Sequence, residues 1–323
     1  MKDSVVKSIR IMFRKVLGLG EYNKYTDEYV QYYDQEANDY ILSRILESSS
    51  GLMISKFGTV ELATILCLLR NQRGITLSER IRGLMGEIKT NPTKAINVLC
   101  KNAGFFPNDL ELAYKYLDLV LKDAKEIDIL GSYLKEEIEL QDILSNAVRV
   151  NLDGYYAPFL WNNPWTQYLG GKRVLVVHPF VDSIKTQYER RDKLFQEPRV
   201  LPSFAELYLV KAVQSIAGNG EKTGFADWFE ALESMKNEMD KYNYDVALIG
   251  CGAYGMNLAA HAKRNGKIAI HLAGWTQMLF GIYGHRWLKE KNKYSAFINE
   301  YWIRPGENEK PQNADTIENG CYW

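Results

Sequence analysis

The second half of the chain alternates short apolar runs with stretches in which apolar residues recur at helical spacing. Strands are expected at Arg173–His178, Leu207–Ile216, Asp245–Gly250 and Lys267–Leu272, and helices at Asp182–Phe195, Ala226–Tyr242 and Met256–Asn265. Continuous apolar strands joined by helices are typical of a parallel sheet whose two faces are both covered. The pattern therefore predicts a Rossmann-like α/β domain with a mostly parallel sheet and helices on both faces.

The first half adds an opening strand and a helical region. Residues 51–58 form a short apolar run closed by glycine, and a strongly apolar helix is expected over Glu61–Asn71. Residues 78–121 read as mainly helical with breaks near Gly104 and Pro107. Short strands are expected at Glu126–Leu134 and Ala147–Leu152, a loop at Tyr155–Trp165, and an irregular, docked segment at Asn299–Trp323.

Residues 1–50 are interpreted as an N-terminal helical extension of a domain that spans residues 51–323. The segment Lys2–Leu17 has apolar residues on one face and basic residues on another, and a second helix is expected over Tyr25–Ser48. The basic helix either packs on the domain with a solvated charged face or lies on an anionic membrane surface. Residues 1–20 are thus a candidate for peripheral contact with an inner membrane.

Composition excludes several classes of protein. The 323 residues include 40 basic and 40 acidic side chains, a balance that argues against a general nucleic-acid binder. The four cysteines lie far apart without a CxxC pair, which favours free thiols in a reducing cytosol over structural zinc. No apolar run approaches the roughly 20 residues of a membrane span, and no signal peptide is recognisable. A cytoplasmic location is expected.

The most legible motif is a G-x-G-x-x-G run at Gly250–Gly255, directly after a predicted strand and before a helix. In that context glycines allow backbone N–H groups to approach a phosphate. A dinucleotide site would also have an acid at the end of the next strand, but that strand ends in His271-Leu-Ala-Gly274. The absence of this acid argues against NAD and SAM binding. The motif therefore indicates either another kind of nucleotide site or a purely structural turn.

Polar groups also follow three other predicted strands, where ligands of open α/β sheets bind. His178 ends one strand; Asp182 or Ser183 could cap the helix behind it, and Lys185 and Arg190 add positive charge nearby. Two further clusters consist of Lys56, Phe57, Gly58, Thr59 and Glu61 after the first strand, and of Gly274, Gln277 and Arg286 after the last. Glu61 is either a carboxylate favoured by the helix dipole or a metal ligand or base.

These pieces together resemble a known family. The chain contains, in this order, the motifs K/R-F-G-x-x-E, HPF-x-D/E-S/T-I-x-x-Q-Y-x-x-R, D-V-A-L-I-G-C-G-A-Y-G and Q-x-L-F-G-I-x-G-x-R-W. This series of motifs is similar to that of bacterial glycosyltransferases of the GT-D fold. The similarity is to a polysaccharide-biosynthesis branch that ends, as this chain does, in Gly320-Cys-Tyr-Trp323. It runs from about Ile54 to the C-terminus.

The resemblance implies a transferase that moves a sugar from a nucleotide-sugar donor, expected to be a UDP-sugar, to a glycan or lipid-linked acceptor. It also implies a divalent metal, Mn²⁺ or Mg²⁺, at an Asp-x-Glu pair; here Thr59 replaces the Asp, so Glu61 alone is the candidate ligand and metal dependence is in question. Glu61, Asp182 and His178 are the candidate catalytic groups. The expected donor-binding residues are Lys56, Phe57, Gly58, Thr59, Lys185, Arg190, Gly250, Gly252, Tyr254, Gly255, Gly274, Gln277 and Arg286.

Two other functions stay open on the sequence. One is a non-catalytic nucleotide-sugar-binding scaffold in a polysaccharide assembly complex, which the replacement at Thr59 favours. The other is a different nucleotide-dependent Rossmann enzyme, an oxidoreductase or a methyltransferase, against which the missing ribose-binding acid counts.

Overall fold

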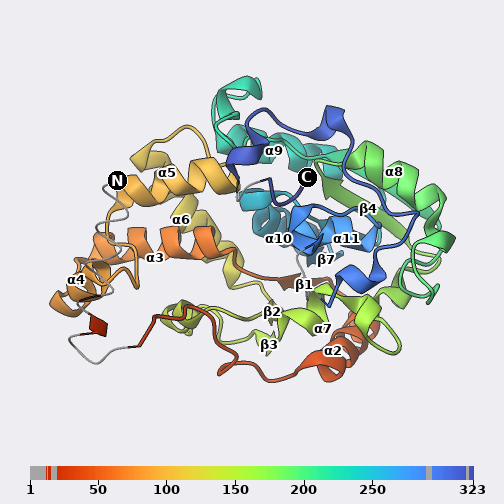
Figure 1. The fold of residues 1–323 in the computed structure, drawn as a ribbon, viewed down its shortest axis with the longest axis horizontal. Coiled ribbons are helices and arrows are strands. Elements are labelled where there is room, and N and C mark those ends of the chain that lie inside the picture. Colours follow the sequence, from red (N-terminus) through yellow and green to blue (C-terminus); the bar gives the residue numbers. More distant parts are fainter. Residues whose placement is uncertain (1–11, 13, 16–19, 289–292, 318–319) are drawn as a thin grey trace.

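The chain forms a seven-stranded sheet in which every strand pair is parallel (Figure 1). The computed structural model describes all residues except 1–11, 13, 16–19, 289–292 and 318–319, so the predicted helix Lys2–Leu17 lies largely outside the described residues. The strand order is β3-β2-β1-β7-β6-β4-β5. The strands are β1 (Leu52–Ser55), β2 (Ile129–Gly131), β3 (Val148–Val150), β4 (Arg173–His178), β5 (Glu206–Lys211), β6 (Val246–Ile249) and β7 (Ile268–His271). The predicted fold class is confirmed.

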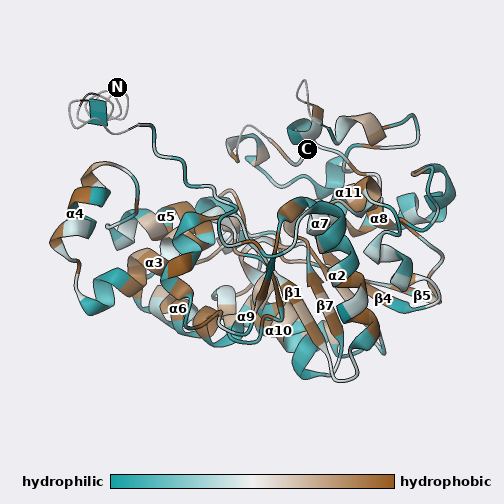
Figure 2. Cartoon of the chain, turned by 90° about the horizontal axis from the view of Figure 1, so that it is seen from below, coloured by the Kyte–Doolittle hydropathy of each residue, from teal (hydrophilic) through white to brown (hydrophobic). Residues whose placement is uncertain are grey.

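Helices cover both faces of this sheet (Figures 1 and 2). Successive strand residues alternate between the two faces: in β4, Val174 and Val176 pack in one core and Leu175 and Val177 in the other. One core takes α3 (Thr59–Arg73), α5 (Pro92–Ala103), α6 (Leu110–Ala124), α9 (Trp228–Met239) and α10 (Gly255–Arg264). The other takes α2 (Asp34–Glu47), α7 (Leu152–Tyr156), α8 (Val181–Glu189) and α11 (Thr276–Leu279). The strands are apolar along their length because both of their faces are buried.

Local sequence signals account for several helix starts. Asn91, Asp109 and Asp227 accept hydrogen bonds from the third following backbone N–H and so begin α5, α6 and α9. A capping box of Thr76 and Glu79 begins the short helix α4 (Leu77–Leu84), which lies beyond α3 at one end of the molecule (Figure 1).

The first predicted helix of the described region begins later than expected. The prediction was Tyr25–Ser48, whereas α2 begins at Asp34. The preceding Tyr-rich segment instead forms isolated β-bridges with other parts of the chain. Tyr25 pairs with Leu134, and Tyr32 pairs with Val150. Pairing with these extended residues satisfies backbone groups that a helix would otherwise have used. The α2 side chains Ala37, Ile41 and Ile45 are buried in the core of the sheet domain, at 0–1% exposure.

Three other predicted elements are shorter or more ordered than expected. Helix α8 ends at Glu189 instead of Phe195, because a 3₁₀ turn follows and Phe195 packs on Phe159 at a ring distance of 5.7 Å. Strand β5 ends at Lys211, and residues 212–216 leave the sheet. The predicted loop Tyr155–Trp165 starts in the last turn of α7 and continues as 3₁₀ turns.

The chain reverses direction across the sheet between β4 and β6. The connection from β4 passes through α8 on one face to the edge strand β5, whereas the connection from β6 passes through α10 on the opposite face to the central strand β7. β4 and β6 are nevertheless hydrogen-bonded neighbours, with Val177 paired to Ile249. Such a switch point opens a crevice at the carboxyl ends of the two strands, where ligands of α/β proteins bind.

The C-terminal segment wraps over these strand ends and caps α8. Glu309 is 1% exposed, and its carboxylate accepts hydrogen bonds from the backbone N–H groups of Asp182 (2.8 Å) and Ser183 (3.3 Å) and from the Ser183 hydroxyl. The expectation that Asp182 or Ser183 caps this helix is therefore wrong. A carboxylate 126 residues further along the chain satisfies the free N–H groups.

The four cysteines are free thiols, and three of them are buried. Among the described residues, no helix is both long and apolar enough to cross a membrane.

We predict that Glu309→Ala lowers the free energy of unfolding by about 2 kcal/mol, because it leaves buried N–H groups at the start of α8 without an acceptor. Urea denaturation followed by circular dichroism measures the change. The exposed neighbour Glu307 provides the control, since Glu307→Ala should leave the midpoint unchanged. Equal midpoints for both variants would contradict the capping role.

Candidate active site

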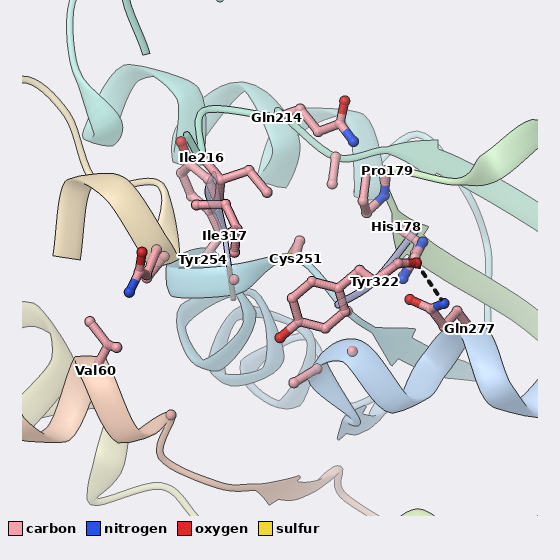
Figure 3. Close-up of a pocket in the computed structure, with 18 of the residues that line it drawn as sticks. Val60, His178, Pro179, Gln214, Ile216, Cys251, Tyr254, Gln277, Ile317 and Tyr322 are labelled. Atoms are coloured by element: carbon pink, nitrogen blue, oxygen red, sulfur yellow. Dashed lines mark hydrogen bonds between the residues drawn. The ribbon is translucent and has the colours of Figure 1, made fainter. Parts of the chain in front are cut away.

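A cavity of about 220 Å³ lies at the carboxyl ends of β1, β4, β6 and β7, at the switch point (Figure 3). We call it the strand-end cavity. Its walls come from the turn after each of these strands, from residues 212–216 after β5, and from the C-terminal segment. Eleven of the predicted site residues line it: Lys56, Gly58, Thr59, Glu61, His178, Gly250, Gly252, Tyr254, Gly274, Gln277 and Arg286.

Five of the predicted site residues do not line this cavity. Asp182, Lys185 and Arg190 are exposed on α8 or just after it, away from the strand ends. Phe57 and Gly255 are buried and do not line the cavity. The helix α8 rises from the crevice and directs its charged face outward, so closeness in sequence to His178 does not bring these charges into the site.

In the described part of the chain, the charged side chains that line the cavity are Glu61, Lys56 and Arg286. The Glu61 carboxylate folds back over Gly58, where an added Cβ would lie 2.0 Å from Oε2, so a side chain at position 58 would displace this carboxylate. No hydrogen bond or ion pair holds this carboxylate within the described part of the chain. Burial lowers the pKa of Lys56, but Tyr156, Glu61 and Tyr322 outweigh that effect and raise it overall. Lys56 is therefore a cation at neutral pH.

Thr59 is engaged by an aromatic neighbour. Its hydroxyl lies 3.3 Å from the hydroxyl of Tyr133, which also donates to the carbonyl oxygen of Phe57 at 3.0 Å. Burial raises the pKa of Tyr133, so the phenol stays neutral. These contacts fix the turn between β1 and α3 and occupy the Thr59 side chain.

His178 is a neutral side chain with a defined tautomer. Its Nδ1 accepts a hydrogen bond from the Phe180 backbone N–H at 3.0 Å, which places the proton on Nε2. Burial at 2% exposure lowers its pKa to about 3. At neutral pH this histidine can donate a hydrogen bond through Nε2, but it is a poor proton acceptor.

Each glycine of the G-x-G-x-x-G run has a close neighbour within the protein. A Cβ at Gly250 would lie 2.5 Å from the Ala273 carbonyl oxygen, and one at Gly252, whose φ is +58°, would lie 2.7 Å from the Ala103 carbonyl oxygen. At Gly255 it would lie 2.1 Å from Nε2 of His271. Packing alone therefore accounts for all three glycines, and phosphate binding by this turn stays a prediction.

His271, at the end of β7, is a second buried neutral histidine. Its Nδ1 lies 3.0 Å from the Ser55 hydroxyl, and its Nε2 has no hydrogen-bond partner among the described residues. Burial, with a smaller contribution from the charge of Lys56, lowers its pKa to about 3. The ring fills the space that Gly255 leaves and ties β7 to β1 and α10.

Tyr322 projects from the C-terminal segment into the cavity, and its hydroxyl points toward the side on which Val60 lies (Figure 3). Its ring lies over Gly274, where an added Cβ would be 2.4 Å away, and the Arg286 guanidinium lies 4.6 Å from the ring centre. Gln277 donates a hydrogen bond to its carbonyl oxygen at 3.2 Å. Gly274, Gln277 and Arg286 thus position the C-terminal segment.

Sequence reasoning missed part of the wall. The missed residues are Val60, Asn102, Ala103, Tyr133, Pro179, Phe180, residues 212–216, Cys251, His271, Ala273, Ile317, Tyr322 and Trp323. A parallel sheet brings the residues after every strand to the same edge, so residues 212–216 could have been found by placing the end of β5 correctly. Asn102 and Ile317 carry no local signal, because they reach the cavity only through the packing of α5 and of the C-terminal wrap.

The described side chains of the strand-end cavity do not group as a metal site. Among the described residues that line the strand-end cavity, Glu61 is the only Asp or Glu, and no three described His, Cys, Asp or Glu residues group as metal ligands. The Thr59 hydroxyl, in the place of the expected Asp, is held by Tyr133. One carboxylate beside an ammonium group fits an anionic ligand better than a cation bound by protein alone.

Comparison of the chain with protein-family models, with curated proteins and with solved structures gave no match. The class that the fold defines is a Rossmann-like α/β protein with a strand-end cavity at a topological switch point.

We predict that the two buried histidines make stability depend on pH. Their pKa values are about 3 in the folded protein and about 6.5 when unfolded, so only the unfolded state takes up protons between these values. Each should lower the free energy of unfolding by about 1.4 kcal/mol per pH unit as the pH falls below 6.5. Urea denaturation at pH 6.5, 5.5 and 5.0 measures the slope.

The variant His271→Asn should reduce that slope by the contribution of one histidine, about 1.4 kcal/mol per pH unit. His285, which is exposed, provides the control, since His285→Asn should keep the slope of the unmodified protein. A slope that His271→Asn leaves unchanged would mean that His271 is not held neutral.

Proposed function

We propose that the protein is a glycosyltransferase that moves a sugar from a nucleotide-sugar donor, expected to be a UDP-sugar, to a glycan or lipid-linked acceptor in bacterial surface-polysaccharide biosynthesis. The observation that carries the proposal is the convergence of eleven predicted donor-site and catalytic residues on one cavity at the switch point of the sheet. We place the enzyme in the cytoplasm, where residues 1–20 either pack on the domain or contact the inner membrane peripherally.

The charges of the cavity suit a diphosphate beside a sugar. Lys56 is a cation in a partly buried setting, where it would stabilise the departing nucleoside diphosphate. The Nε2–H of His178 is a further donor for phosphate oxygens. These donors take the role that a divalent metal has in the family, so no step of the proposed reaction passes through a metal ion.

Glu61 is the best candidate for the base. Asp182 is exposed outside the cavity, and His178 presents a protonated Nε2 and has a pKa of about 3. The carboxylate of Glu61 lines the cavity, and no protein partner among the described residues competes for it. In the proposed reaction it accepts the proton of the acceptor hydroxyl as that oxygen bonds to the anomeric carbon of the donor sugar.

The engaged hydroxyl of Thr59 is the observation that favours the second candidate function, a non-catalytic nucleotide-sugar-binding scaffold. Both functions require donor binding, and only the transferase requires turnover. A nucleotide-dependent oxidoreductase or methyltransferase gains no support, since His271 and not an acid ends β7.

We predict that one nucleotide class stabilises the protein in a thermal-shift panel of UDP-, GDP-, dTDP- and CMP-sugars, each with EDTA or with Mn²⁺. A donor at about 100 times its dissociation constant adds about 2.7 kcal/mol of stability, a readily measured rise in midpoint. The shift should persist in EDTA, because Lys56 supplies the positive charge. A cooperative melt that no nucleotide sugar shifts would overturn both the transferase and the scaffold.

We predict that Glu61→Gln lowers the rate of sugar transfer by about 10²- to 10⁴-fold, the range expected when a general base is lost, and leaves donor binding within a few fold. Release of the nucleoside diphosphate and the thermal shift measure the two quantities. Glu111→Gln, at an exposed position on α6, is the matched control. A Glu61→Gln variant with normal turnover would remove Glu61 from the mechanism.

A further inference from the structure

A second cavity, of about 500 Å³, lies on the other side of the first turn of α3. It is enclosed by the segment Tyr22–Tyr25, by α3 and α5, and by residues 86–89, which follow α4. Only two residues, Thr59 and Val60, line both this cavity and the strand-end cavity. One turn of helix therefore separates the two spaces.

This dividing turn carries the reactive carboxylate of the proposed mechanism. Glu61 follows Thr59 and Val60 directly, and its carboxylate lies over Gly58 on the side of the strand-end cavity. Aromatic rings line the same boundary: Tyr133, in the strand-end cavity, stacks on Tyr25, in the second cavity, at a ring distance of 6.0 Å and an angle of 18°. A ligand in the second cavity would thus be separated by this one turn of helix from Glu61, which lines the strand-end cavity.

The second cavity combines an apolar floor with a polar rim. Leu62, Ala95 and Leu134 are buried at its base, and Val98 is 37% exposed at its edge. Tyrosine rings flank the polar groups of the segment Tyr22–Tyr25. Flat aromatic faces beside hydroxyl, amide and ammonium groups suit a sugar ring, which has apolar C–H faces and polar edges.

The charges around this cavity disfavour a cationic ligand. Its two carboxylates are already paired, Glu136 with Arg70 at 2.7 Å and Glu87 with Arg14 and Arg82. Its two ammonium groups, Lys24 and Lys89, have no ion pair within the described ranges of the chain. A neutral or acidic saccharide matches this balance.

We propose that the second cavity is the acceptor site, and that it takes a neutral or acidic saccharide whose hydroxyl reaches the donor sugar across Thr59 and Val60. This assignment rests on the proposed glycosyltransferase function. The acceptor oxygen forms a bond to the anomeric carbon, and the bond from that carbon to the diphosphate oxygen breaks. The nucleoside diphosphate leaves with the electron pair, and Glu61 takes the hydroxyl proton.

The test fills the second cavity without touching the first. Val98→Trp places an indole at the cavity edge on α5, at a half-exposed position that tolerates substitution. Asn97→Trp, at the next position and lining neither cavity, is the matched control, and Val98→Ala checks that loss of the valine alone is harmless. The probes are UDP-sugars as donors and p-nitrophenyl glycosides of neutral hexoses and of a uronic acid as acceptors.

Val98→Trp should raise the KM for the glycoside at least tenfold while UDP-sugar binding and hydrolysis to water change less than twofold. Asn97→Trp and Val98→Ala should behave as the unmodified protein. Unchanged glycoside KM in Val98→Trp, or no glycoside binding to the unmodified protein with UDP present, would overturn the acceptor assignment. Absence of nucleotide-sugar binding in the unmodified protein would instead overturn the proposed function.

Discussion

The parallel pairing of β4 with β6 is the constraint on which the candidate site depends. Parallel strands point their carboxyl ends to one edge, and the helices after β4 and β6 leave that edge on opposite faces of the sheet. No helix can then cover the strand ends between them, so a crevice remains. His178, which ends β4, and Gly250, which directly follows β6, form its base. The walls follow from what the neighbouring strands and the C-terminal segment bring to the same edge.

Close contacts between backbone and side chains keep that base rigid. Gly250, Gly255 and Gly274 each leave room for a neighbour that a Cβ would displace, and two of these neighbours are the Tyr322 ring and the neutral ring of His271. Burial keeps the two histidines uncharged, so the described charges of the cavity are Lys56 and Glu61, close together between β1 and α3, and Arg286 against Tyr322. Two cations and one carboxylate held in fixed positions are suited to electrostatic stabilisation of a reacting diphosphate.

The C-terminal segment contacts both the start of α8 and the strand-end cavity. Glu309 caps α8 from within this segment, and Tyr322 enters the strand-end cavity from its end. Sequence patterns indicate that the closing aromatic residues are docked, but they contain no information about where. The position of the segment is decided by hydrogen bonds to Gln277 and Gln214, which come from elements far apart in the chain.

The sequence by itself determined the strands, most helices and the parallel class of the sheet, because apolar periodicity and glycine turns are local signals; β4 has the predicted bounds, Arg173–His178. It also located the residues that directly follow β1, β6 and β7, since every parallel strand ends at the same edge. Only the tertiary structure decided that Asp182, Lys185 and Arg190 face solvent and that Tyr133 and Tyr322 face the cavity. The physical reason is that the direction of a helix face and the path of a wrap depend on contacts between distant residues, which local patterns do not record.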